Sequence, residues 1–335
     1  APLTPPISDQ APLTPPISEQ APLTPPISDQ VPLTPPISDQ VPLTPPISDQ
    51  APLTPPICDQ VPLTSPIRVE IPGDDLHAHI DKVLNLDIRD DDIYLATYPK
   101  AGTHWMWEII QMLLKGIPEY DKRVKESAFL DFRPPETVNS IPSPRVLNCH
   151  YPVTLTPKRV ISKGIKIIHV QRNFKDICVS AFHHLKTFKL YGAETFDDFL
   201  PIMIGSYGIH FFCSWAEYVR GWERFTNDNP GDVLNIYFED LKEDPVREIA
   251  KVDKFLETGQ DEGMFKQIAE ACHFTNMKKA NKEIKENNFN TEVDMYRKGE
   301  VGDWKNWFTV AQSERVDQWL EENMLGSQLN FRDAL

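Results

Sequence analysis

The feature that most constrains this chain is an alternation of short apolar runs with segments of helical periodicity, which begins near residue 91. Helical segments repeat apolar residues every three to four positions, whereas strand-like runs are short and end at turn residues. The run GIKIIHVQR is almost continuously apolar, which is typical of a strand buried on both faces. The alternation predicts an α/β fold, a single domain whose central, mostly parallel sheet is flanked by helices. The expected strands are residues 91–98, 145–152, 164–172 and 233–240, and the expected helices are residues 105–116, 174–186 and 246–257.

The first 60 residues cannot join such a fold, because they are six near-copies of APLTPPISDQ, followed by the degenerate copy VPLTSPIRVE. They contain 18 of the 32 prolines and no aromatic residue, so they bury too little apolar surface to offset the entropy of ordering. We expect residues 1–68 to be a disordered, polyproline II-like repeat segment and residues 69–335 to be the globular domain.

Three roles for the repeat segment remain open. The first is a spacer or solubilising arm, which needs no partner. Each of the six near-copies also contains P-L-T-P, a minimal PxxP ligand, although no Arg or Lys flanks it. Each of the six further contains a Thr-Pro pair such as Thr4-Pro5, whose repeated phosphorylation would add negative charge.

Charge and cysteine content exclude several classes of protein. The formal net charge is −15, of which −6 falls in the first 70 residues (seven acids and one Arg), leaving −9 on the rest. A domain this acidic is not expected to bind nucleic acid through a broad basic face. Five cysteines, odd in number and without CxxC spacing, suit a reducing compartment and no metal framework. With no transmembrane-length apolar stretch or signal peptide, we expect a cytoplasmic protein that does not bind membranes.

A candidate anion site follows the first expected strand, where residues 97–110 read TYPKAGTHWMWEII. A strand–loop–helix brings the free N–H groups of the first helical turn, and its positive dipole end, to one point. Gly102 lets the backbone approach an anion, Thr103 offers a hydroxyl and Lys100 a mobile charge. Taken by itself, the loop could also be an ordinary strand-to-helix turn that binds no anion and exposes Lys100 to solvent. The missing Walker A glycine counts against an ordinary NTPase.

Two further residues fall at strand ends. His150 lies near the end of the second expected strand, and Arg172 ends the third. Ligands of open α/β sheets bind at the carboxyl ends of the strands, so these residues are expected to share a site with the loop.

Five segments, in order, resemble the cytosolic sulfotransferases that use 3′-phosphoadenosine 5′-phosphosulfate (PAPS). TYPKAGTHW is similar to YPKSGTTW, SPRVLNCHYP to SPRVIKTHLP, and KIIHVQRNFKDICVS to KVIYVARNPKDVAVS. VLNIYFEDLKEDPVREI is similar to LFYEDMKEDPKREI, and RKGEVGDWKNWFTVAQSE to RKGxxGDWKNHFTVAQNE. The resemblance covers about residues 85–335 and implies a PAPS-dependent sulfotransferase with a P-loop-like phosphosulfate loop.

The resemblance also implies roles for individual residues. His150 matches the catalytic base, and Lys100 would act both in catalysis and in binding the nucleotide. The phosphosulfate loop would be Lys100, Ala101, Gly102, Thr103, His104 and Trp105, with Trp105 against the adenine. The residues at the 3′-phosphate would be Arg172, Ser180, Arg297, Lys298 and Gly299, and those lining the nucleotide would be Phe238, Cys272, Phe274 and Met277.

The chemistry of PAPS agrees with these positions, because it carries two separate phosphate groups and the sequence offers two separate anion sites. A neutral histidine can remove the proton of the acceptor, a contribution of roughly 10²–10⁴-fold. Lys100 can neutralise charge that develops on the departing phosphate. A sulfuryl group carries less charge than a phosphoryl group, so no metal is expected.

Several positions depart from the pattern of the family. Ala101 replaces a serine and His104 a threonine, and protonation of His104 would make PAPS affinity sensitive to pH between 6 and 8. Asn148 replaces the lysine of KTH, which removes a positive charge beside the transferring group and leaves room for another residue to compensate. Phe238 replaces a tyrosine, and Cys272 replaces a threonine with a poorer hydrogen-bonding group.

The acceptor is expected to be a small phenol, alcohol, steroid or amine. Asn148 and His184 are candidate substrate residues, and His184 either forms a polar gate or lies on the surface. Residues 184–198 are expected to form a mobile loop over the site. His77 and His79 are close in sequence, as metal ligands often are, but no third His or Cys lies near them in the sequence. We therefore interpret them as part of a solvated turn.

A dimerisation motif, KxxxTVxxxE, is matched at the C-terminal end and implies a homodimer; a surface turn is the alternative. Its residues are Lys305, Thr309, Val310 and Glu314. Two other functions remain open for the whole chain. One is a catalytically impaired nucleotide-binding protein whose repeats recruit partners, and the other is a phosphoryl transferase that needs Mg²⁺ and ATP.

Overall fold

A computed structural model describes residues 76–187, 193–205, 213–280 and 296–335. The predicted repeat segment, residues 1–68, lies outside the described residues, as do residues 188–192 of the predicted loop.

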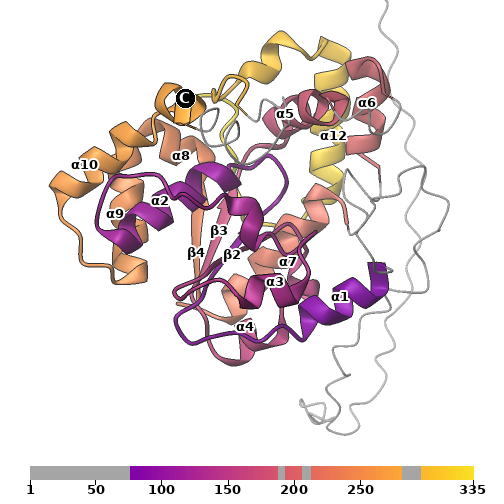
Figure 1. Ribbon diagram of the computed structural model, residues 1–335. Coiled ribbons are helices and arrows are strands. Elements are labelled where there is room, and N and C mark those ends of the chain that lie inside the picture. Colours follow the sequence, from indigo (N-terminus) through magenta and orange to yellow (C-terminus); the bar gives the residue numbers. More distant parts are fainter. Residues whose placement is uncertain (1–75, 188–192, 206–212, 281–295) are drawn as a thin grey trace, which may run out of the picture. The chain divides into compact units, whose positions relative to one another are not determined.

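The centre of the domain is a four-stranded sheet in the order β2-β1-β3-β4 (Figure 1). Its strands are β1 (Ile93–Thr97), β2 (Val146–Cys149), β3 (Ile167–Gln171) and β4 (Val233–Tyr237), and every neighbouring pair is parallel. All five residues of β1 and of β3 are buried, as the continuous apolar run predicted for β3. The predicted α/β class with a parallel sheet flanked by helices is confirmed.

Two apolar clusters cover the two faces of the sheet, and β1 contributes alternate residues to each. Ile93 and Leu95 pack with α2 (Thr103–Lys115), α9 (Pro245–Leu256) and α10 (Glu262–Ala271). Tyr94 and Ala96 pack into the opposite cluster, which holds the apolar residues of α5, α6, α7 and α12. Figure 1 shows the first group of helices on one side of the strands and α5, α6 and α12 on the other.

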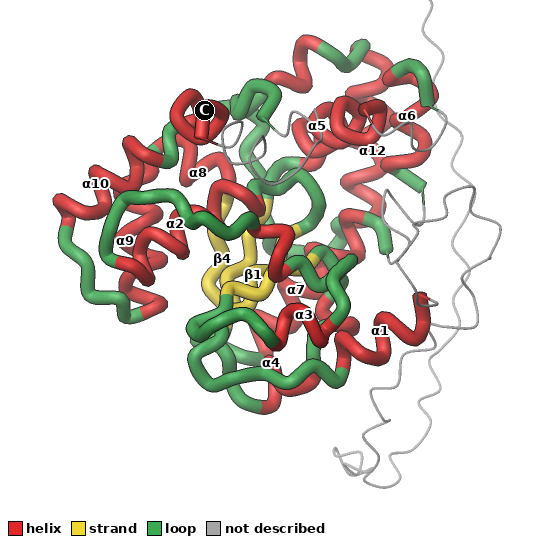
Figure 2. The backbone as a smooth tube through the Cα atoms, in the orientation of Figure 1, coloured by secondary structure: helices red, strands yellow, loops and turns green. Residues whose placement is uncertain are grey.

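The remaining elements connect or extend these layers, and Figure 2 shows the helices and loops around the strands. They are α1 (Leu76–Leu84), η1 (Lys125–Ala128), α3 (Pro135–Asn139), η2 (Val153–Leu155), α4 (Lys158–Ser162), α5 (Phe174–Thr187), α6 (Phe196–Met203), α7 (Trp215–Asp228), α8 (Phe238–Glu243), η4 (Asp303–Asn306) and α12 (Val310–Asn323).

The observed strands are shorter than predicted: β2 ends at Cys149 rather than at residue 152, and β3 begins at Ile167 rather than at residue 164. Two further differences have a local cause. The fourth strand ends at Tyr237 rather than at residue 240, because helix α8 begins at Phe238 with acidic residues in its first turn. The predicted loop 184–198 is partly helical: α5 continues to Thr187, and α6 begins at Phe196 behind a capping box at Thr195.

The interpretation of His77 and His79 as part of a solvated turn is wrong. Both lie in helix α1, and His79 is 1% exposed, with Nε2 2.8 Å from the backbone oxygen of Leu130. This hydrogen bond ties α1 to the segment that precedes β2. Among the described residues, no helix is long and apolar enough to cross a bilayer.

Candidate active site

The loop between β1 and α2 forms a tight turn at the carboxyl end of the sheet. The amide of Ala101 donates to the carbonyl of Tyr98 at 3.1 Å, and Lys100 takes a left-handed conformation with φ 69°. Gly102 has φ 121°, and a Cβ there would lie 3.1 Å from the ring of Phe238. Helix α2 starts at Thr103, so its first-turn N–H groups, which have no partner within a helix, face the end of the sheet.

His150 is held beside this loop by the register of the sheet, which pairs Ala96 with Cys149 and so brings Thr97 next to His150. Nδ1 of His150 lies 2.7 Å from the carbonyl oxygen of Thr97, which can only accept. Nδ1 therefore carries the hydrogen, and Nε2 is the ring nitrogen with the lone pair. The hydroxyl of Thr97 also contacts Nδ1 at 3.0 Å and the hydroxyl of Thr103 at 2.7 Å.

Asp131 orients the backbone of the same histidine, and sequence reasoning missed it. Its carboxylate accepts from the amide of His150 at 3.0 Å, and the residue is 3% exposed. Burial raises the pKa of Asp131 to about 7. Phe129, two residues earlier, places its ring centroid 5.0 Å from the imidazole of His150 and forms an apolar wall.

His104 faces a carboxylate. Its Nε2 lies 2.9 Å from Oε1 of Glu126, so Nε2 carries the hydrogen of the neutral ring. Burial and the neighbouring Lys125 lower the pKa of His104 to about 4. The ring is thus neutral between pH 6 and 8 before ligand binds, and the structure does not support the predicted pH sensitivity in that range.

Arg172 joins the loop to the C-terminal segment. Its guanidinium donates to the carbonyl of Lys100 at 3.2 Å and to that of Glu300 at 2.9 Å, and it stacks on the ring of Phe238 at 4.1 Å. Nε of Arg172 is buried and has no hydrogen-bond partner within the part of the chain that the structure describes. A buried, unpaired donor between two basic segments is a suitable contact for an anion.

One carboxylate, that of Asp303, pairs with both cations of the basic segment at residues 297–299. Arg297 and Lys298 each lie 2.6 Å from an oxygen of Asp303. Burial opposes ionisation there, but hydrogen bonds from Lys298, Asn306 and Arg297 outweigh it and lower the pKa of Asp303 to about 2. Gly299 has φ 66°, and a Cβ there would lie 2.3 Å from the ring of Phe274.

Apolar residues surround the loop on the side of α10. Trp105 and Phe238 meet edge to face at 5.4 Å between ring centroids. Cys272 is 1% exposed and directs its thiol to the sulfur of Met112, 3.8 Å away in the core. Met277 is buried, and Phe274 is partly exposed. Ser180, in α5, is partly buried too.

Known proteins match this chain over most of its length. A family profile described as "Sulfotransferase domain" matches residues 90–328. Sulfotransferase 1A1 of Mus musculus is 36% identical over 274 residues, covering 76% of this chain and 91% of that protein. Sulfotransferase 1A1 of Rattus norvegicus is 35% identical over 278 residues, covering 75% and 90%. The chain belongs to the sulfotransferase family.

Solved structures share the fold. Mouse sulfotransferase SULT7A1 complexed with PAP superposes with a TM-score of 0.62 at 29% identity, covering 75% of this chain and 90% of that chain. Retinol dehydratase in a complex with retinol and PAP has a TM-score of 0.67 at 18% identity, covering 77% and 88%, which supports the fold alone.

The structure brings most of the predicted site residues of this sulfotransferase to one edge of the sheet, with exceptions. Asn148 is fully buried in β2, and its amide donates to the carbonyl of Lys125 at 2.9 Å. His184 is half-buried in the last turn of α5. Lys305, Thr309, Val310 and Glu314 lie apart from the site and are all exposed.

Sequence reasoning missed Thr97, Lys125, Glu126, Phe129 and Asp131 in this sulfotransferase. Thr97 ends the strand before the loop, a position that could have indicated a role. The other four lie in a segment without strand or long helix, whose contact with the loop depends on tertiary structure. Among the described residues, no group of three or more His, Cys, Asp or Glu side chains is arranged to hold a metal ion.

Proposed function

We propose that this sulfotransferase moves the sulfuryl group of PAPS to a hydroxyl or amine of a small acceptor. The observation that carries the proposal is the juxtaposition of His150 with the strand–loop–helix of residues 97–105 at the carboxyl end of β1. The residues suit the nucleotide, because Arg172 links the loop to the second basic segment through the carbonyls of Lys100 and Glu300. Its buried Nε has no hydrogen-bond partner among the described residues.

His150 is the proposed general base. Nδ1–H is held by the carbonyl of Thr97, so the lone pair of Nε2 can receive the proton of the acceptor. A bond forms between the acceptor oxygen or nitrogen and the sulfur. The bond between sulfur and the 5′-phosphate oxygen breaks, and that oxygen keeps the electron pair, which leaves PAP. PAPS supplies the activated sulfuryl group when it is bound.

Lys100 and the loop are proposed to hold the 5′-phosphosulfate. The backbone of Lys100 to Trp105 presents the helix N-terminus, and the ammonium of Lys100 neutralises the charge that builds on the departing phosphate. Gly102 is proposed to let the backbone approach the ligand. Its φ of 121° favours glycine, and a Cβ would lie 3.1 Å from the ring of Phe238.

The 3′-phosphate is proposed to bind Arg172, Ser180 and residues 297–299. Arg297 and Lys298 would exchange part of their pairing with Asp303 for pairing with phosphate. The adenine is proposed to lie against Trp105 and Phe238, with Phe274 and Met277 nearby. Cys272 is a weaker candidate, because its thiol faces Met112 in the core.

The acceptor is proposed to be a small molecule with an apolar body and a nucleophilic hydroxyl or amine. The ring of Phe129 beside His150 supports this, because it gives an apolar surface next to the base. Phenols, alcohols, steroids and amines all meet the requirement. His184 remains a proposed gate residue. We also propose that the enzyme acts in the cytoplasm, as the free cysteines of the described residues suit a reducing compartment.

The test is transfer of labelled sulfate from PAPS to a panel of phenols, alcohols, steroids and amines, with a chelator present. His150→Ala is expected to lower kcat by roughly 10²–10⁴-fold while PAP still binds. Lys100→Ala is expected to lower both transfer and nucleotide affinity. Transfer by the wild type alone supports the proposal. Binding of PAPS without transfer to any acceptor would instead support a nucleotide-binding protein that has lost turnover.

A homodimer is proposed from the C-terminal motif. Thr309 caps helix α12, and Val310 behind it is 75% exposed, although it is a large apolar residue. Lys305 and Glu314 are exposed on either side. Val310→Glu is expected to convert dimers into monomers in sedimentation, because it places a charge in an apolar contact. A wild type that is already monomeric, or a variant of unchanged size, would refute the dimer.

A further inference from the structure

Asn148, near the end of β2 and two residues before His150, has an uncharged side chain. Asn148 is fully buried, and its amide donates to the backbone carbonyl of Lys125 at 2.9 Å. The corresponding position in the family motif is a lysine. In this chain, the residue at position 148 instead holds the backbone of a different lysine, Lys125, through a hydrogen bond.

Lys125 is an unusual cation for a protein interior. Its side chain is 5% exposed, and burial lowers its pKa. Within the described part of the chain its ion-pair partner is Glu126, at 3.8 Å, which is longer than a hydrogen bond. The ammonium also lies 4.1 Å from the ring centroid of Phe129. The charges of Glu126 and Asp131 both favour the ammonium, but burial is the larger effect. A buried ammonium without a close ion pair costs folding free energy, and such groups are common at functional sites.

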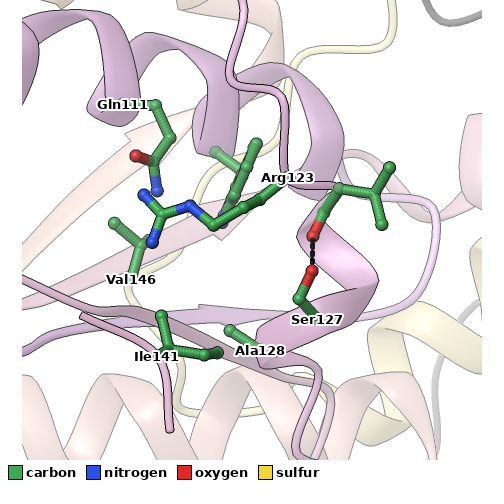
Figure 3. A pocket seen from close by; sticks show the side chains of 8 residues that line it. Gln111, Arg123, Ser127, Ala128, Ile141 and Val146 are labelled. Carbon is green, nitrogen blue, oxygen red and sulfur yellow. Dashed lines mark hydrogen bonds between the residues drawn. The ribbon is translucent and has the colours of Figure 1, made fainter. Parts of the chain in front are cut away.

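The segment that carries Lys125 has two sides. Arg123, Val124, Ser127 and Ala128 line a small cavity against α2 and β2 that has room for about one water molecule (Figure 3). The hydroxyl of Ser127 donates to the carbonyl of Val124 at 2.6 Å and closes this turn. Lys125 and Glu126 are not part of the cavity lining, and their contacts lie on the catalytic side.

Those contacts place the ammonium between the two parts of the site. Glu126, its ion-pair partner, lies 2.9 Å from Nε2 of His104 in the phosphosulfate loop. Phe129, the ring beneath the ammonium, lies 5.0 Å from the imidazole of His150. A group held between the loop and the base lies where the sulfuryl group must pass.

We propose that Lys125 supplies the positive charge for sulfuryl transfer that Asn148 lacks. The inference rests on the proposed function. The ammonium faces the sulfuryl oxygens while the bond from sulfur to the phosphate oxygen breaks and the bond to the acceptor forms. Lys125 gives up no proton; the acceptor proton goes to Nε2 of His150, and the phosphate oxygen keeps the electron pair. Binding of the anion gives the ammonium the close partner that Glu126 does not provide.

The first test removes this charge. Lys125→Met keeps the length and apolar stem of the side chain, and Lys122→Met changes an exposed lysine of the same segment as a control. We expect Lys125→Met to lower kcat by about 10²-fold or more, in the range for loss of one group that stabilises transition-state charge. It should also weaken binding of PAPS more than binding of PAP, which lacks the sulfuryl group. Lys122→Met should match the wild type.

The second test moves the charge back to β2. Asn148→Lys in the Lys125→Met background is expected to recover at least about tenfold in kcat, since a stem of four carbons carries an ammonium toward the same place. A purely structural role of Lys125 predicts no such rescue. If Lys125→Met does not fold, the same comparison is made with Lys125→Gln alone and with Lys125→Gln combined with Asn148→Lys.

Failure of this inference is distinct from failure of the proposed function. A wild type that transfers sulfate, with Lys125→Met equal to it in kcat and in the ratio of PAPS to PAP affinity, would overturn the role of Lys125. Loss of kcat without rescue by Asn148→Lys would do the same. If the wild type transfers nothing, the proposed function fails, and the affinity ratio alone still decides whether Lys125 faces the sulfuryl group.

Discussion

The two candidate anion sites of this sulfotransferase are built differently. At the β1–α2 loop, the backbone of Lys100 to Thr103 and the first turn of α2 are already in place, and local hydrogen bonds hold them. At residues 297–299 the cations are side chains, and Asp303 pairs with both of them. The first site is ready for an anion, whereas the second must give up ion pairs to bind one.

The two sites are therefore expected to contribute differently: the first to the orientation of the reacting group, and the second to the affinity for the nucleotide. A fixed backbone site loses little entropy on binding and can position the group that reacts. A site of ion-paired side chains gains only the difference between the old pairing and the new one. Arg172 belongs to both, because it donates to the carbonyls of Lys100 and Glu300. It is therefore the residue whose loss should affect the two sites together.

The largest effect is expected for Arg172→Met. The variant loses charge-assisted hydrogen bonds, each worth about 1.5–3 kcal/mol, and leaves Asp176 without a cation at 3.8 Å. PAP affinity measured by calorimetry should fall by about 10- to 100-fold. Arg159→Met, which removes an exposed ion pair of α4, is the matched control and should bind as the wild type does. Equal affinities for the two variants would separate Arg172 from the nucleotide site.

An intermediate effect is expected for Gly299→Ala, which tests the second site alone. The new Cβ would lie 2.3 Å from Phe274, and the φ of 66° is strained for alanine. The segment must shift, so PAP affinity should fall by about tenfold while the loop at Gly102 is untouched.

Gly164→Ala provides the control for backbone strain. Gly164 has φ 61°, and a Cβ there would meet nothing within 4 Å. Gly164→Ala should carry the backbone strain without the steric contact, so it should lower stability less than Gly299→Ala and leave PAP affinity unchanged. If both variants bind PAP alike, residues 297–299 do not form part of the site.

The smallest effect is expected for His104→Gln, which should change how the free energy of unfolding depends on pH. The measurement concerns the β1–α2 loop and needs no ligand. The pKa of His104 is about 4 in the folded protein and about 6.5 when unfolded, so only the unfolded chain binds the proton between these values. His104 therefore contributes stability that increases as the pH rises from 4 to 6.5, whereas Asp131, whose pKa is raised to about 7, contributes in the opposite direction. His104→Gln should remove the contribution of His104 and make the slope of stability against pH less positive in urea titrations.

His169 keeps part of the slope in that variant, because burial lowers its pKa to about 4 as well. His104→Gln should therefore remove only the share of the slope that belongs to His104. A slope equal to that of the wild type would mean that His104 has the same pKa in the folded and unfolded chain, and the predicted pH sensitivity of PAPS affinity would then return.

Much of the fold followed from local sequence. Apolar periodicity identified all four strands, and it placed α2, α5 and α9 within two residues of their observed ends. The errors lie at boundaries, such as Phe238, where a helix starts directly after the strand because the chain turns to pack against Trp105. Elements with weaker periodicity or short length, such as α3 and α4, were not predicted.

The sequence by itself determined which residues reach the carboxyl edge of the sheet. Strand ends are local features, and parallel strands bring their ends together, so Lys100, His150 and Arg172 could be placed there in advance. Only the tertiary structure decided what those residues meet. The proton of His150 on Nδ1, the neutral state of His104, the pairing of Lys298 with Asp303, and the burial of Lys125 all depend on side chains from distant segments. Such contacts depend on the direction of each side chain and the dielectric around it, which no local pattern encodes.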